Sequence, residues 1–192
     1  MIISFISPRF VRSIPRRFAL VLAVPLLAVS AHAQDCVSEA GFTPEGSAAR
    51  LVDRAIDSAR TSIRLAGYNF TSPDIVRRLL AAKRRGVNVA VLVDARSNLQ
   101  EDRSGKSRAA LNLLAGAAVA VRTVDAYPLH HDKYIVIDSA TVETGSFNYT
   151  TAAARYNSEN VLVVWHCENL AKAYLDHWQS RWSQGQDWRA NY

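Results

Sequence analysis

The pattern of apolar and polar residues predicts alternating helices and strands over much of the chain. Residues 47–60 carry apolar side chains at the spacing of one helix face, with Ser47 as the expected N-cap. Residues 62–70 (SIRLAGYNF) have the short, mostly apolar pattern of a strand. A second helix is predicted over residues 72–85, because a serine–proline pair begins it and a glycine follows it.

The next segments continue this alternation. Residues 87–93 and 118–124 are predicted strands, and residues 108–115 are a predicted helix. Residues 94–107 (DARSNLQEDRSGKS) lack periodicity and are polar almost throughout, so we expect a mobile surface loop. Repeated helix–strand alternation predicts an α/β fold whose sheet is largely parallel and flanked by helices.

The last part of the chain has a different pattern. A hairpin is predicted from strands at 133–137 and 141–144, and another buried strand at 160–164. The final helix carries large apolar side chains at every fourth position, namely Leu170, Tyr174, Trp178 and Trp182. This stripe predicts core packing rather than a platform for stacking bases. We expect His177, which adjoins this stripe, to lie at the surface or to support a residue of a functional site.

Residues 1–33 have the pattern of an export signal. Four arginines without an acid precede an apolar run over residues 18–29, and Ala31-His32-Ala33 resembles a signal-peptidase site. An uncleaved anchor is the alternative, but a membrane-spanning helix needs about 20 apolar residues. We therefore expect a signal peptide at 1–33 and a single domain at 34–192. The protein would be periplasmic or secreted, without stable membrane insertion after cleavage.

Charge and cysteine content add little about substrates. The net charge is +6, but four of the 23 basic residues and none of the 17 acids precede Gln34, so residues 34–192 carry 19 − 17 = +2. The two cysteines, Cys36 and Cys167, fall in a part of the chain for which we expect a compartment that permits disulfides. The sequence leaves open whether they form a bridge or remain two thiols.

The candidate chemistry gathers around the predicted hairpin. Read as a strand, residues 131–137 place His131 and Lys133 on one face at the start of a buried run. Burying two such groups unpaired is costly, and a phosphate would satisfy both, although a strand start that frays into solvent is the alternative. Ser146 and Asn148 share a face in the same way, and Gly145 lets the backbone approach a ligand.

These groups supply a nucleophile or base, a fixed cation and two neutral donors, as phosphoryl transfer requires. The alternative for Ser146 and Asn148 is a turn former and a backbone cap. The chain lacks paired histidine or cysteine motifs, the Gly-x-Ser-x-Gly motif and a phosphate-binding glycine loop. His130 and His131 point to opposite faces of a strand, so we expect neither a metal nor another cofactor.

The motif resembles that of a known superfamily. His131-x-Lys133, followed after four residues by Asp138 and later by Gly145-Ser146-x-Asn148, resembles the His-Lys-Asp motif and the downstream Gly-Ser-x-Asn of the phospholipase D superfamily. Glu159 matches the later acidic position. The length, the single motif copy and the export signal resemble the small bacterial endonucleases of that superfamily.

The resemblance implies an α/β sandwich with a central mixed sheet and metal-independent catalysis. Two motifs usually form one site, so a chain with one motif implies a homodimer. One His131 would attack phosphorus and form a phosphohistidine, and the partner's His131 would protonate the leaving oxygen and then activate water. Lys133, Ser146 and Asn148 would bind phosphate oxygens, and Glu159 would orient a His131 imidazole.

Asp138 completes the catalytic motif, but it alternates away from the His131 face. We expect a structural role for it, such as a salt bridge near the dimer interface. His130 is the weaker histidine candidate, because it shares neither the spacing to Lys133 nor its strand face.

Three functions remain open at this stage. The first is a nonspecific endonuclease that acts on DNA or RNA, for which basic residues in and after the polar loop could follow a nucleic-acid backbone. Nearby acids partly offset this charge. The second is a phospholipase D, although no amphipathic segment for a membrane surface is evident. The third is a non-catalytic nucleic-acid-binding protein on the same fold.

Overall fold

The computed structural model describes residues 36–190. These residues belong to one compact unit. The predicted signal peptide at 1–33 lies outside the described residues and remains a prediction. No helix in the described part combines the length and apolarity needed to cross a membrane.

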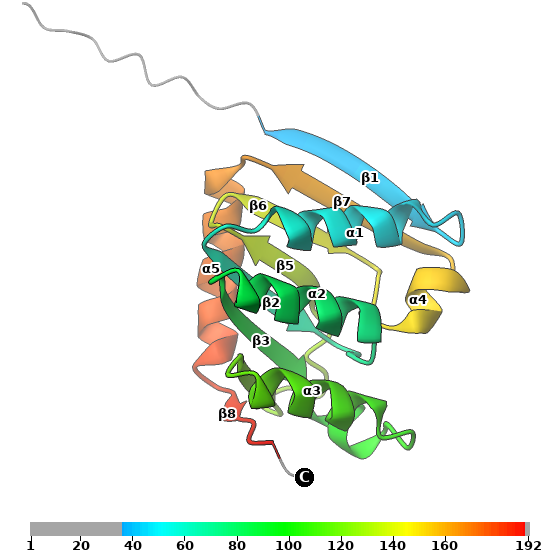
Figure 1. Cartoon of the computed structure of the whole chain (residues 1–192), viewed down its shortest axis with the longest axis vertical. Helices are drawn as coiled ribbons and strands as arrows, with labels where there is room; N and C mark the ends of the chain where they lie inside the picture. Colours follow the sequence, from blue (N-terminus) through cyan, green and yellow to red (C-terminus); the bar gives the residue numbers. More distant parts are fainter. Residues whose placement is uncertain (1–35, 191–192) are drawn as a thin grey trace, which may run out of the picture. The chain divides into compact units, whose positions relative to one another are not determined.

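One eight-stranded sheet runs through this unit in the order β1-β7-β6-β5-β2-β3-β4-β8 (Figure 1). The strands are β1 (Val37–Thr43), β2 (Ser62–Gly67), β3 (Asn88–Asp94), β4 (Ala120–Val124), β5 (Lys133–Ile137), β6 (Thr141–Gly145), β7 (Glu159–Trp165) and β8 (Gln186–Asp187). The predicted mixed α/β sheet is confirmed. Its parallel part is smaller than the helix–strand alternation suggested, because only β2, β3 and β4 pair in parallel and all other neighbours pair antiparallel.

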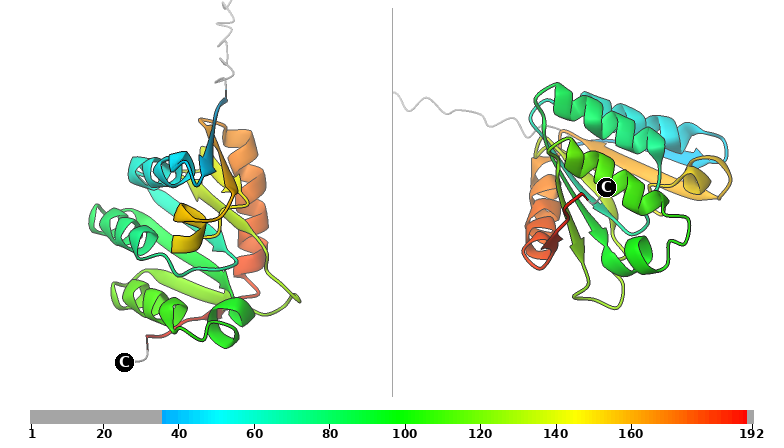
Figure 2. Two further views of the ribbon diagram at one scale, coloured as in Figure 1. Left: turned by 90° about the vertical axis from the view of Figure 1, so that its right-hand side faces the viewer. Right: turned by 60° about the horizontal axis from the view of Figure 1, so that its bottom comes forward.

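Helices cover the sheet on both faces. Helices α1 (Ser47–Ser58), α2 (Pro73–Arg84) and α3 (Lys106–Gly116) lie side by side on one face, and α5 (Glu168–Trp182) lies on the other (Figures 1 and 2). The short α4 (Thr151–Arg155) precedes β7. The larger core lies under α1–α3, and the smaller one lies under α5.

The aromatic stripe of α5 packs as predicted. Trp178 is buried in the smaller core, and its indole N–H donates to the carbonyl of Leu65. Leu170, Tyr174 and Trp182 are partly buried against the same core. The stripe therefore fixes α5 on the sheet, although Tyr174 keeps part of its ring exposed.

Two local predictions were wrong. Gly46, in the left-handed region, caps α1 in place of Ser47, whose hydroxyl instead bonds the backbone of Phe42. The expected loop at 94–107 is largely structured: Asp94 ends β3, and η1 (Arg96–Gln100) follows as a π-helical turn. Some of its polar side chains are buried and bond backbone groups: Asn98 accepts from the Phe70 amide and donates to the Tyr68 carbonyl.

Strand β1 was not predicted from the sequence, and the pairing of the two cysteines was left open. Strand β1 pairs with β7 at one edge of the sheet although most of its side chains are exposed, which weakens the strand pattern. A disulfide joins Cys36 to Cys167, with 4.8 Å between the Cα atoms. It ties the start of β1 to the residue before α5.

Candidate active site

The hairpin start lies at the carboxyl end of β2, because β5 runs antiparallel to β2 and Gly67 pairs with Lys133. This end of an α/β sheet is where ligands usually bind. Lys133 is 9% exposed, and its Nζ donates to the His131 carbonyl over 2.9 Å. The His131 imidazole is exposed, with its ring centroid 4.6 Å from that of Tyr68. Lys133 Nζ lies 5.1 Å from the same Tyr68 ring. The two predicted catalytic side chains therefore gather around one tyrosine.

The charge of Lys133 is set by opposing effects. Burial lowers the pKa of its ammonium group, while the negative charges of Asp132 and Glu159 raise it, and the net pKa is below the usual value for lysine. The two carboxylates thus favour the charged form of a lysine in a dry position. A protonated Lys133 can hold a phosphate oxygen as a point charge.

Ser146 and Glu159 form a hydrogen-bonded pair beside the hairpin. The Ser146 hydroxyl donates to Glu159 Oε2 over 2.6 Å and accepts from the Asn160 amide over 3.1 Å. Glu159 Oε1 accepts from Asn157. Gly145 is required here, since a Cβ at this position would lie 2.2 Å from the Asn160 carbonyl oxygen. The carboxylate of Glu159 is therefore held by Ser146 and Asn157 within one protomer, and not by His131.

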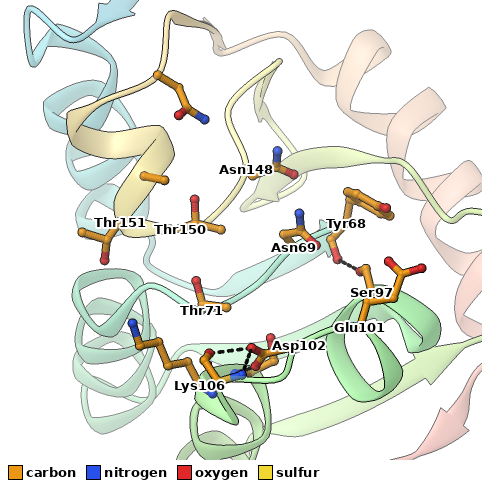
Figure 3. Close-up of a pocket in the computed structure, with 14 residues that line it drawn as sticks. Tyr68, Asn69, Thr71, Ser97, Glu101, Asp102, Lys106, Asn148, Thr150 and Thr151 are labelled. Carbon is orange, nitrogen blue, oxygen red and sulfur yellow. Dashed lines mark hydrogen bonds between the residues drawn. The ribbon is translucent and has the colours of Figure 1, made fainter.

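Asn148 faces a polar cavity of about 530 Å³ (Figure 3). Its Oδ1 is buried without a hydrogen-bond partner, so the amide keeps bonding capacity for a ligand. The neighbouring Tyr149 holds this segment in place, because its carbonyl accepts from the amides of Thr71 and Ser72. Tyr68, Asn69 and Asn157 line the same cavity.

Asp138 lies at the far end of β5 and organises the backbone. Its carboxylate accepts three amide N–H groups at 2.8 Å, from Arg60, Thr61 and Ser62. Burial raises its pKa, but these hydrogen bonds outweigh burial, and the pKa lies below the usual value. The structural role expected for Asp138 thus takes the form of backbone hydrogen bonds at the start of β2, rather than a salt bridge.

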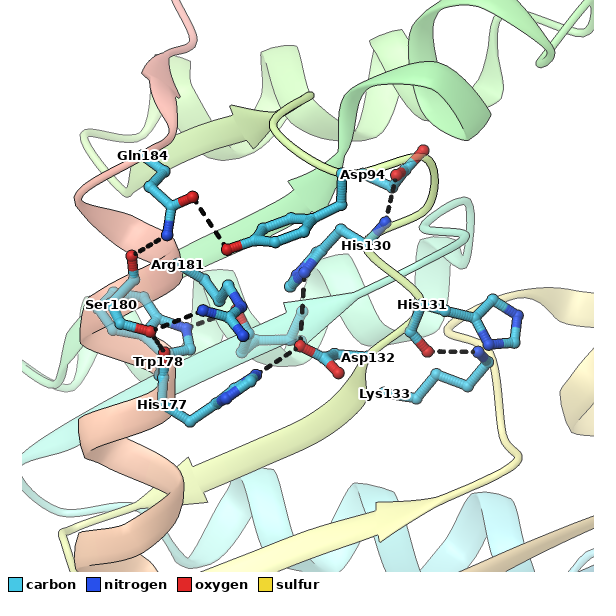
Figure 4. Close-up of polar contacts among 12 residues, drawn as sticks. Asp94, His130, His131, Asp132, Lys133, His177, Trp178, Ser180, Arg181 and Gln184 are labelled. Atoms are coloured by element: carbon cyan, nitrogen blue, oxygen red, sulfur yellow. Dashed lines mark hydrogen bonds and ion pairs between the residues drawn. The ribbon is translucent and has the colours of Figure 1, made fainter.

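A second polar cluster lies behind the hairpin (Figure 4). Asp132 Oδ2 contacts His177 Nε2 of α5 at 2.9 Å and His130 Nδ1 at 3.4 Å. The His130 amide donates to Asp94 Oδ2 over 2.8 Å. His130 is 3% exposed, and burial lowers the pKa of its imidazole, which favours the neutral form. His130 is thus an internal support, in line with its weaker place among the histidine candidates.

Sequence reasoning did not find this cluster. Asp132 and His177 are 45 residues apart, and neither belongs to the motif. The one local indication of the cluster in the sequence was the charged Asp132 between His131 and Lys133, because strand alternation directs its side chain to the face that α5 covers. In the described residues, no group of three or more His, Cys, Asp or Glu side chains is arranged to hold a metal ion.

Known proteins are similar to this chain in sequence and fold. Residues 52–182 match the family model "Cardiolipin synthase, PLD-like domain". The crystal structure of "a phospholipase D family member, Nuc from Salmonella typhimurium" aligns with a TM-score of 0.77 and 49% identity, over 81% of this chain and 99% of that one. The chain belongs to the phospholipase D superfamily. The His-x-Lys motif of this superfamily corresponds here to His131 and Lys133, at the start of β5.

Curated relatives of the superfamily are longer. A "Phospholipase D" of Rickettsia bellii is 40% identical over 141 residues, which are 73% of this chain and 66% of the relative. A "Mitochondrial cardiolipin hydrolase" of Mus musculus is 31% identical over 140 residues, 73% of this chain and 60% of the relative. This chain therefore spans about two thirds or less of these relatives.

Proposed function

We propose that this protein is a metal-independent phosphodiesterase that hydrolyses DNA or RNA through a phosphohistidine. The observation that carries the proposal is the exposed His131 imidazole beside the buried Lys133 ammonium at the carboxyl end of β2. An imidazole nitrogen of His131 would form a bond to phosphorus while the bond to the leaving oxygen breaks. A second imidazole would protonate that oxygen and then take a proton from the water that releases the phosphate.

The second imidazole would come from another copy of the chain. Within one protomer the other nearby histidines, His130 and His177, are bonded to Asp132. Phe42 and Leu162, which are 53% and 39% exposed, lie on adjacent strands β1 and β7. Asn160, which pairs with Phe42, also bonds Ser146. An exposed apolar surface thus adjoins the site, and a second copy that covers it would bring two His131 side chains together.

The cavity at Asn148 supports a nucleic-acid substrate. Amides and hydroxyls form most of its lining, as suits sugars and bases, and Glu101, Asp102 and Lys106 complete it. The apolar groove between α2 and α3, lined by Val76, Leu80 and Leu113, contains neither His131 nor Lys133. This apolar groove therefore lies apart from the proposed phosphate site and would not hold acyl chains beside it. The second candidate is a phospholipase D, which the names of the Rickettsia and mouse relatives favour.

One experiment separates these functions. The purified protein is incubated in EDTA with plasmid DNA, RNA and phosphatidylcholine vesicles, and all hydrolysis products are measured. We expect nucleic-acid cleavage that EDTA does not reduce. Loss of activity in EDTA with recovery on adding a divalent ion would contradict metal independence. Phosphatidic acid as the main product would establish the lipid function, and binding of DNA without turnover would indicate a non-catalytic protein.

The nucleophile is tested by substitution. His131→Ala should lower turnover by at least about 1000-fold, because the other histidines near Lys133 in the described residues, His130 and His177, are held by Asp132. His166→Asn is the matched control: His166 is exposed, has a φ of 55° that asparagine tolerates, and lies after β7. Retained activity in His131→Ala, with a phosphoenzyme still trapped by an alkaline denaturing quench, would place the nucleophile elsewhere.

The proposal includes export to the periplasm or the exterior. The arginine-rich start and apolar run of residues 1–33 support it, as does the Cys36–Cys167 disulfide, which an oxidising compartment would preserve. Cell fractionation, with mass spectrometry of the mature N-terminus, tests this. A cytosolic protein that retains residue 1 would contradict it.

A further inference from the structure

A second cavity borders the catalytic pair from the side of α5. It measures about 450 Å³ and reaches from His131 and Lys133 to Tyr174 and His177. A diester bound at His131 has two ester arms, which leave the phosphorus in different directions. One of these arms could enter this cavity, which shares no lining residue with the cavity at Asn148.

The two α5 side chains that line this cavity, Tyr174 and His177, are held in position by their neighbours. The Tyr174 ring packs edge-to-face on Tyr134, with 4.9 Å between centroids, and Tyr134 is 3% exposed. His177 is held by Asp132, which His130 contacts from the protein interior. A ligand that enters this cavity would meet preformed walls, which reduces the entropy lost on binding.

The lining suits a nucleoside better than an acyl chain. Tyr174 supplies an aromatic surface of the kind on which bases stack. A carboxylate only accepts hydrogen bonds, so the His177 nitrogen facing Asp132 carries the hydrogen, and the other nitrogen of a neutral ring is an acceptor. Thr144 adds a hydroxyl. The charge of Asp132 makes the cavity a poor place for a second phosphate.

We propose that this α5 cavity binds the nucleoside on one side of the scissile phosphate, with Tyr174 as its stacking surface. The inference rests on the proposed phosphodiesterase function and adds to it a specific side chain outside the motif. Trp178 and Trp182 of the same stripe remain packing residues, since they stack on each other at 4.6 Å.

Two small substrates with one leaving group provide the test. Thymidine 5′-(p-nitrophenyl phosphate) and methyl p-nitrophenyl phosphate differ only in the second ester arm. The wild-type protein should hydrolyse the thymidine ester with the higher kcat/KM. Tyr174→Ala should reduce this preference about tenfold, mainly through KM, because stacking of one base is lost. The methyl ester lacks a nucleoside and serves as the reference substrate for each variant, and Tyr174→Phe should retain the preference.

The controls give each outcome a meaning. Asn69→Ala alters the other cavity and should keep the thymidine preference. If Asn69→Ala loses the preference and Tyr174→Ala keeps it, the nucleoside binds at Asn148 and the proposal is wrong. A wild-type protein without any preference would also overturn it, whereas methyl ester hydrolysis that depends on His131 would leave the phosphodiesterase proposal standing. The methyl ester rate reports whether Tyr174→Ala is folded, and Tyr174→Leu replaces it if it is not.

Discussion

Asp132 acts on the candidate site through its charge as well as through hydrogen bonds. It lies between His131 and Lys133 in the chain, and its carboxylate is fixed by His177 at 2.9 Å. The groups that face the Lys133 ammonium are Asp132 and Glu159, which raise its pKa, together with the His131 carbonyl and the Tyr68 ring. Burial works in the opposite direction. The Lys133 ammonium, which we propose to bind phosphate, thus depends on a residue outside the motif.

Asp132→Asn should therefore move the alkaline limit of activity to lower pH. Loss of the negative charge lowers the pKa of Lys133 further, so the cation is lost at a less alkaline pH. The measurement is kcat/KM against pH for wild type and variant. Asp176→Asn is the control, because Asp176 is exposed and pairs with Lys172 on the same helix. An alkaline limb that does not move in Asp132→Asn would show that Asp132 does not support the charge of Lys133.

At the scale of elements, β6 carries a buried carboxyl group beneath the site. Glu143 is 1% exposed and accepts from the Tyr149 hydroxyl over 2.9 Å. Burial raises the pKa of Glu143 to about 8, and the hydrogen bond from Tyr149 offsets only part of this shift. Because Tyr149 also anchors the segment that holds Asn148, the protonation of Glu143 bears on how firmly β6 positions that segment.

The free energy of unfolding should consequently fall as pH rises from about 4.5 to about 8. In this range the unfolded chain releases the proton of Glu143 while the folded protein keeps it, at a cost of at most about 1.4 kcal/mol per pH unit. Urea unfolding at several pH values measures the slope. Glu143→Gln should flatten it, whatever its effect on absolute stability, and Glu45→Gln, an exposed control, should not. Identical slopes in Glu143→Gln and wild type would contradict the prediction.

At the scale of the whole molecule, the proposed site needs two copies of the chain. A heterodimer of wild type and His131→Ala would contain a single His131 and lack either the nucleophile or the acid. Mixing wild type with excess variant under conditions of subunit exchange should therefore lower activity per wild-type subunit several-fold, in line with the remaining wild-type homodimers. Sedimentation gives the oligomeric state. Unchanged activity per wild-type subunit, or an active monomer, would contradict a shared site.

The sequence alone determined the local features, because helix and strand periodicity and short motifs act over a few residues. It predicted most elements of the sheet and the packing stripe of α5, and it singled out His131 and Lys133, which line one cavity, and Asn148, which lines another. The sequence did not predict strand β1, because most side chains of this edge strand are exposed and lack the apolar alternation. It did not predict the turn at 96–100, because the buried side chains there are polar.

Only the tertiary structure decided the contacts between distant segments. It showed that Cys36 and Cys167 form a disulfide, a pairing that the sequence left open. It also showed that the Asp138 carboxylate accepts hydrogen bonds from the backbone amides at the start of β2. It also brought His177 to Asp132 and Tyr174 to the cavity beside His131. These pairings depend on how α5 crosses the sheet, and no local periodicity encodes that crossing.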